Sequence, residues 1–100
     1  MPKEEIERQA VIAVKIDGGS NRVALIGIIV QDPESAELVN SLLHLNRQYI
    51  VGRMGVPYRE KKVSIISIAL DAPEDVVSAL AGRLGMISGV SSKTVYPKTA

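Results

Sequence analysis

The hydrophobic pattern of the chain changes period several times, and each change marks a predicted element. Residues 22–30 form an apolar run rich in β-branched side chains, which is typical of a buried strand. From Ser35 onward apolar residues recur at helical spacing, which predicts a helix that ends near residues 46–48. The apolar stripe expected on this helix consists of Leu38, Val39, Leu42, Leu43 and Leu45.

The middle of the chain predicts a pair of strands. Residues 49–55 form the first, and residues 61–70 form a second strand that is strongly apolar and contains neither glycine nor proline. The segment Val56–Glu60 contains a proline and is expected to connect the two. A short connection between consecutive strands pairs them antiparallel, so this stretch predicts a hairpin.

A second helix is expected to follow this hairpin. It opens with Asp71-Ala-Pro-Glu-Asp, in which the first residue lies near the N-cap and the proline lies in the first turn. Gly85 is expected to end the helix, with Met86 and Ile87 folding back over that end, before a last strand at residues 90–96. The face expected to be buried consists of Val76, Val77, Leu80, Ala81 and Leu84.

From residue 22 the predicted order is strand, helix, strand, strand, helix, strand. This is the βαββαβ order of the ferredoxin-like α+β fold, in which two helices cover one face of a four-stranded antiparallel sheet. The first and third strands then lie in the middle, in agreement with their apolar composition. We expect residues 1–21 to form an N-terminal extension with an extra short strand at 10–16, and residues 22–98 to form the folded domain.

The two central strands do not alternate between apolar and polar residues, as a sheet with one face in water would. If one parity faces the helices, Val23, Leu25 and Ile29 point outward from the first strand, and Val63 and Ile65 from the third. Soluble monomers rarely expose an apolar patch larger than roughly 300–600 Å². We therefore expect a homo-oligomer, a dimer or a tetramer, that covers the open sheet face. The alternative is that the strand at 10–16 folds back over it.

Composition narrows the functional classes. The 100 residues are enough for one domain, and their net charge of +1 comes from basic and acidic residues that are interspersed. Direct nucleic-acid binding by this chain alone is therefore not expected. The absence of cysteine excludes disulfides and thiol catalysis. A charged N-terminus and short apolar runs predict a cytoplasmic protein with no membrane contact.

Motifs for catalysis or cofactor binding are missing from the sequence. There is no nucleophile elbow, no phosphate-binding loop and no dinucleotide fingerprint, so we expect no enzymatic activity and no cofactor. His44 is the single histidine, and one imidazole without cysteine does not make a transition-metal site. We expect His44 to be a solvated surface residue.

The segment Arg53–Lys62 carries the densest group of charges. Arg53, Tyr58 and Arg59 fall within it, around two glycines and a proline. One interpretation is a solvated hairpin tip with ordinary surface charges. The other is a site for an anion or a partner protein, because arginine binds carboxylates in a bidentate manner and tyrosine offers an amphipathic contact. Asp32 is well explained as a helix cap, and it could also line a ligand cleft between subunits.

Several separate blocks of the sequence carry a resemblance to a known family. The blocks are Gly52-Arg-Met-Gly-Val-Pro-Tyr-Arg-Glu-Lys, Ser64-Ile-Ile-Ser-Ile-Ala-Leu-Asp-Ala-Pro, Ser78-Ala-Leu-Ala-Gly-Arg-Leu-Gly and Ser88-Gly-Val-Ser-Ser-Lys-Thr-Val. Between about Val23 and Lys98 the chain resembles the small iron-only hydrogenase system regulators. The resemblance implies an ACT-like form of the ferredoxin-like fold, similar to the C-terminal domain of the nickel-responsive regulator, and oligomeric assembly. The nickel site of that regulator uses several histidines and a cysteine, so it does not carry over to this chain.

The resemblance also implies a function. It predicts a non-enzymatic regulatory module that senses a small molecule, with ligands held at subunit interfaces near the first strand–helix loop, here Gln31–Ser35. The residues we expect to bind such a ligand are Asp32, Glu34, Arg53, Tyr58 and Arg59. The alternative is an interaction or assembly accessory without a small-molecule ligand, which uses the Arg53–Lys62 tip for docking.

Overall fold

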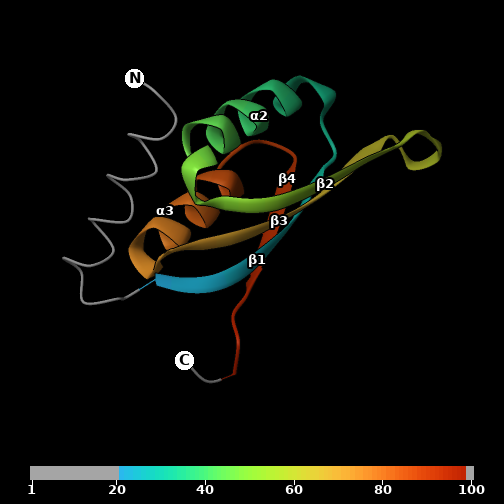
Figure 1. Cartoon of the computed structure of the whole chain (residues 1–100). Helices are drawn as coiled ribbons and strands as arrows, with labels where there is room; N and C mark the ends of the chain where they lie inside the picture. Colours follow the sequence, from blue (N-terminus) through green and yellow to red (C-terminus); the bar gives the residue numbers. More distant parts are fainter. Residues whose placement is uncertain (1–20, 99–100) are drawn as a thin grey trace.

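The computed structural model describes residues 21–98 and confirms the predicted order of elements. The sheet is four-stranded and antiparallel with the strand order β2-β3-β1-β4, and both helices cover the same face (Figure 1). The predicted extra strand at 10–16 lies outside the described residues. The elements are β1 (Asn21–Val30), η1 (Pro33–Ser35), α2 (Ala36–Leu45), η2 (Arg47–Tyr49), β2 (Ile50–Tyr58), η3 (Arg59–Lys61), β3 (Val63–Pro73), α3 (Glu74–Gly85) and β4 (Val90–Val95).

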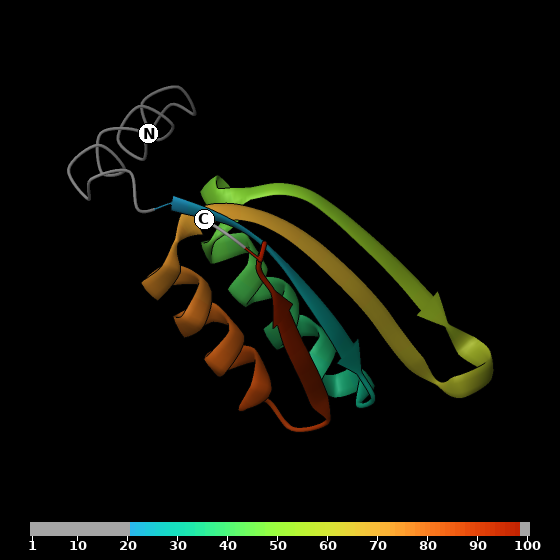
Figure 2. The same ribbon diagram turned by 90° about the horizontal axis from the view of Figure 1, so that it is seen from below.

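The two central strands place alternate side chains on opposite faces, as the sequence predicts. β1 pairs with β3 over the whole length of β1, with Ile26 opposite Ile68 in the middle of the pair. Both of these isoleucines are completely buried under the helices. The intervening residues of β1 point to the other face, where Leu25 and Ile29 are each 45% exposed. One side of the sheet is therefore core, and the other side is open (Figure 2).

The predicted buried face of the second helix is confirmed, but that of the first helix is only partly correct. On α3, Val77, Leu80 and Leu84 are buried, and Val76 and Ala81 pack against the core. On α2 only Val39 and Leu43 are buried, whereas Leu38 and Leu45 are 59% and 65% exposed. These two leucines are seven residues apart and share a helix face that points away from the sheet. The prediction that they belong to the buried stripe is wrong.

Several predicted boundaries also shift. β2 continues through Val56–Tyr58, so the tight connection is the 3₁₀ turn Arg59–Lys61, completed by Lys62 at φ 54°. β3 runs on to Pro73, which places Asp71 within a strand and not at a helix cap. Met86 does not fold back over the helix end, since it is 86% exposed, whereas the next residue, Ile87, packs against the core.

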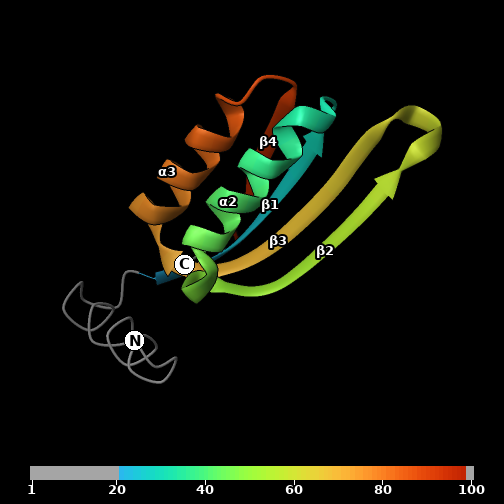
Figure 3. The same ribbon diagram turned by 90° about the horizontal axis from the view of Figure 1, so that it is seen from above.

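Two irregular features of β2 position the candidate site. The pairing of β2 with β3 contains a bulge between Ile50 and Gly52. Beyond it, Arg53 pairs with Ile68 and so lies on the helix-facing side of the sheet. The far half of the β2–β3 ribbon curves away beyond the end of β1, and neither helix covers it (Figure 3). All of β2 after Ile50 is exposed.

Candidate functional site

The predicted ligand residues fall into two groups in the structure. Arg53, Tyr58 and Arg59 lie along the β2–β3 ribbon, where Arg53 lines one hollow and Tyr58 and Arg59 line a neighbouring one. Asp32 and Glu34 lie at the start of η1 and line neither hollow. A common role for these residues in ligand binding stays a prediction.

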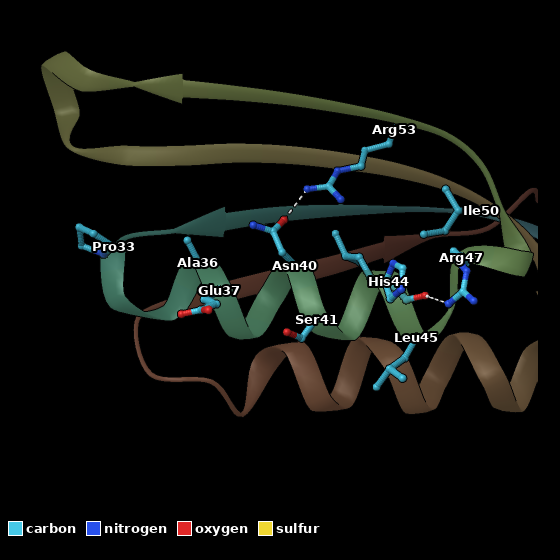
Figure 4. Close-up of a pocket in the computed structure, with 11 residues that line it drawn as sticks. Pro33, Ala36, Glu37, Asn40, Ser41, His44, Leu45, Arg47, Ile50 and Arg53 are labelled. Atoms are coloured by element: carbon cyan, nitrogen blue, oxygen red, sulfur yellow. Dashed lines mark hydrogen bonds between the residues drawn. The ribbon is translucent and has the colours of Figure 1, made fainter.

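The larger hollow, of about 1060 Å³, lies between α2 and the start of β2. Arg53 reaches across from β2, and its Nη2 donates a hydrogen bond of 2.6 Å to Oδ1 of Asn40 on α2 (Figure 4). At one end of the hollow Arg47 donates a 2.9 Å hydrogen bond to the carbonyl oxygen of His44. Pro33, Ala36 and Ile50 contribute apolar surface to its lining. The hollow therefore combines an aliphatic lining with two guanidinium groups, each of which is hydrogen-bonded to a residue of α2.

A smaller hollow of about 250 Å³ continues along the ribbon toward its tip. Pro33 lines both hollows, so the two lie next to each other. Arg59 and Lys62 line the small one together with the aliphatic residues Val30 and Val63. We call the two hollows together the α2–β2 groove.

The α2–β2 groove is basic, although the whole chain is almost neutral. Four cationic side chains line it, and Glu37 is its one carboxylate. The cationic residues are Arg47, Arg53, Arg59 and Lys62. None of them forms an ion pair with another described residue, since the ion pair within residues 21–98 joins Arg22 to Glu74. Within residues 21–98, no carboxylate therefore neutralises these four charges through an ion pair.

Asp32 has a structural role, which the sequence predicts. Its Oδ1 accepts a 3.0 Å hydrogen bond from the backbone N–H of Glu34 and so caps η1. The loop that contains it packs tightly against the α3–β4 connection. Ser35 donates a 2.6 Å hydrogen bond from its hydroxyl to the carbonyl of Ser88, and the amide of Gln31 donates to Gly89 at 2.7 Å. This junction joins the two loops at one end of the sheet.

The open sheet face contains a third hollow, centred on Gly27 and about 330 Å³ in volume. Gly27 pairs with Ser67 on one side and Lys93 on the other, so the three residues form one row across the sheet. A Cβ at Gly27 would meet no atom within 4 Å, which shows that the missing side chain makes the depression. Ile29 and Ile65 stand beside it in the next row. We call this feature the Gly27 hollow.

Some residues of these sites are missed by sequence reasoning. Lys93 and Ser67 enter the Gly27 hollow only through strand register, which no local pattern reveals. Asn40 is an ordinary polar residue in the sequence, and its importance depends on the approach of Arg53 from another element. The one signal that could have identified Asn40 is its position: it is a polar residue on α2 that faces the edge strand β2.

Metal-binding and membrane features are not found among the described residues. Within residues 21–98, no group of three His, Asp or Glu side chains lies close enough to hold a metal ion. In the same part of the chain, no helix has the length and apolarity to cross a membrane.

Comparisons with known proteins place this architecture among solved structures. The uncharacterized protein TM1266 from Thermotoga maritima is 39% identical, with a TM-score of 0.75, and the match covers 78% of this chain and 99% of that one. A formyltetrahydrofolate deformylase from Pseudomonas putida KT2440 is 16% identical with a TM-score of 0.56, over 75% of this chain and 29% of the enzyme. At that identity the likeness concerns the fold alone. No curated protein matches the chain at a significant level.

A sequence profile of a protein family agrees with the structural comparison. The profile of the TM1266-like family, described as "Iron-only hydrogenase system regulator, putative", matches residues 22–94. This range runs from the start of β1 almost to the end of β4. It also contains the quoted blocks on which the resemblance rests, except the last residue of the final block. The chain belongs to the TM1266-like family of iron-only hydrogenase system regulators.

Proposed function

We propose that this protein is a non-enzymatic regulatory module of the iron-only hydrogenase system, which assembles as a homo-oligomer and senses a small molecule held between subunits. The family description supports the regulatory role. The observation that carries the proposal is the open sheet face, which is apolar and contains the Gly27 hollow.

The size of the open face supports its burial against a second copy. Its large apolar side chains are each 38–61% exposed. If such side chains remove roughly 150–200 Å² each when fully buried, they present about 600 Å² together, or about three quarters of the ~800 Å² that one partner contributes to a standard interface. The residues are Val23, Leu25, Ile29, Met54, Val56, Ile65 and Val95. A surface of this kind on both copies can pair with itself across a two-fold axis.

The Gly27 hollow supports a ligand at the same interface. Its volume lies at the lower end of the roughly 300–1,000 Å³ range of small-molecule sites. The ammonium group of Lys93 and the hydroxyls of Ser67 and Ser91 offer hydrogen bonds beside aliphatic walls. A second copy would close the hollow from above, which removes water and strengthens these polar contacts. The chemistry favours a small organic anion.

Replacing Leu25 by aspartate is expected to dissociate the oligomer. Burying an unpaired carboxylate in the interface costs about 2 kcal/mol or more, which weakens association roughly 30-fold. Light scattering coupled to size-exclusion chromatography measures the mass of each variant. Leu38→Asp is the matched control, because Leu38 is also exposed but lies on α2 and away from the open face. A monomeric wild-type protein at micromolar concentration would refute the oligomer, and so would a Leu25→Asp variant of unchanged mass.

Ligand sensing is expected to depend on Lys93. In a thermal-shift screen with amino acids, nucleotides, small organic acids and divalent metals, an organic anion should raise the melting temperature in a concentration-dependent way. Lys93→Ala should abolish this shift, whereas Lys98→Ala, an exposed lysine beyond β4, should retain it. If no compound shifts the wild-type protein, or if the shift survives Lys93→Ala, this site does not sense a ligand.

A second candidate function is docking of a protein partner without a small-molecule ligand. The specific observation in its favour is the α2–β2 groove, where four cations and a single carboxylate surround an aliphatic lining. This function and ligand sensing use opposite faces of the sheet.

A further inference from the structure

We infer that the α2–β2 groove binds an acidic amphipathic helix of a partner protein. The inference rests on the second candidate function above and names the chemistry of the partner. It does not require the oligomer, since the groove and the open face lie on opposite sides of β2.

The shape of the groove indicates a polypeptide. The larger hollow, of about 1060 Å³, lies at the upper limit of the roughly 300–1,000 Å³ typical of small-molecule sites, and the smaller one adds about 250 Å³ nearer the ribbon tip. The groove follows the length of α2, whose ten residues span about 15 Å, and continues to the ribbon tip. An elongated partner therefore fills it better than a compact metabolite.

The position of the groove within the layers indicates a helix. α2 and α3 cover the sheet on one face, but the outer strand β2 extends beyond them (Figure 3). The helix-facing residues of β2 beyond the bulge are Arg53, Gly55 and Pro57. Gly55 leaves open space there, since a Cβ would meet nothing within 4 Å. A third helix beside α2 would complete the layer and place its apolar stripe over the half-buried Ile50.

The charges indicate that the polar side of this helix is acidic. Arg53 is held over the groove by a single described hydrogen bond, to Asn40, so its remaining N–H groups can bind a carboxylate in a bidentate manner. Arg47 lies at the Ile50 end of the groove, and Arg59 and Lys62 lie at the tip end. Carboxylates spaced along one side of a docked helix could each contact one of these cationic side chains.

A polypeptide explains the lining better than a nucleic acid does. Single-stranded nucleic acid is typically held by aromatic side chains on which bases stack. The one aromatic residue of the groove is Tyr58, whose hydroxyl donates a 3.1 Å hydrogen bond to Glu60 at the solvent-exposed tip.

Selection from a displayed library of random 16-residue peptides against the full chain tests the inference. The peptides kept for study are those that bind wild-type protein but not Arg53→Glu. We expect these peptides to be rich in Asp and Glu, with apolar residues at helical spacing. A synthetic copy should bind at least tenfold more weakly to Arg53→Glu by fluorescence polarisation, whereas Arg83→Glu, an equal charge change on exposed α3, should bind as the wild type does.

Three outcomes would overturn the inference. Either no selected peptide depends on Arg53, or the dependent peptides lack acidic residues, or a short DNA duplex binds the same groove more tightly at equal salt. Circular dichroism establishes that each variant is folded. Repeating the titration with the Leu25→Asp variant separates this inference from the oligomer, because docking in the groove is expected to persist in a monomer.

Discussion

Replacing Gly89 by alanine is expected to lower the free energy of unfolding by about 2–4 kcal/mol. Gly89 has φ +72°, a left-handed conformation that a residue with a side chain adopts only at a cost. A Cβ there would also lie 2.8 Å from Cβ of Asp32 and 3.2 Å from its backbone nitrogen. The loop cannot move away freely, because Gln31 and Ser35 are hydrogen-bonded to the same connection.

Urea denaturation at fixed protein concentration measures this loss. Gly82→Ala is a control of opposite sign, because Gly82 lies in α3 with nothing within 4 Å of the added Cβ. Alanine at that helical position should raise stability by roughly 0.5–1 kcal/mol. Unchanged stability of Gly89→Ala would mean that the junction between the two loops is not rigid.

Replacing Leu43 by alanine is expected to cost about 2–5 kcal/mol, whereas the same change at Leu45 should cost less than about 1 kcal/mol. The two leucines lie two residues apart on α2, but Leu43 is 1% exposed and Leu45 is 65% exposed. Truncation of Leu43 leaves a cavity between the helix and the sheet. Truncation of Leu45 removes surface that is already in water.

Both variants are compared with wild type by urea denaturation, with the slope of the transition as a test of unchanged cooperativity. Equal losses at the two positions would contradict the placement of α2 on the sheet. If Leu45→Ala proved the more damaging change, the helix would be rotated relative to the arrangement described above.

The central part of the fold could be predicted from the sequence because its signal is local. β1 and β3 are apolar runs without breakers, and the alternation of strand residues then assigns each side chain to a face. The cap at Asp32 is equally local, since it involves a residue two positions away. Such features depend on neighbours in the sequence and need no knowledge of the tertiary structure.

The α2 stripe could not be predicted correctly because helical spacing alone admits more apolar residues than one face can bury. Leu38 and Leu45 satisfy the spacing, but the curved sheet contacts only the face that carries Val39 and Leu43. The prediction of Asp71 as a helix cap was wrong because a tertiary contact also decides its conformation. Pairing with Val23 of β1 keeps it in the strand, so an interaction between distant segments overrides a local capping signal.

The candidate site was predicted only in part. Arg53, Tyr58 and Arg59 stand out in the sequence as a charged segment, and the structure arranges them along one groove. Asn40 and Lys93 become relevant only through the approach of distant strands and helices. Any contact of Arg53 or Lys93 with a partner also involves the partner's residues, and these cannot be read from this sequence.

The bulge at the start of β2 decides which side chains each face of the sheet receives. Ile50 pairs with Leu70, but Gly52 pairs with Ala69, so one residue is inserted relative to a regular ladder. If the same residues paired with β3 as a regular ladder from Ile50, without the bulge, Arg53 would fall opposite Ser67 and enter the open apolar face. Met54 and Val56 would then turn toward the helices. The bulge absorbs the one extra residue between Ile50 and Gly52, and so it keeps the positive charge of Arg53 and the apolar surface on opposite sides of one strand.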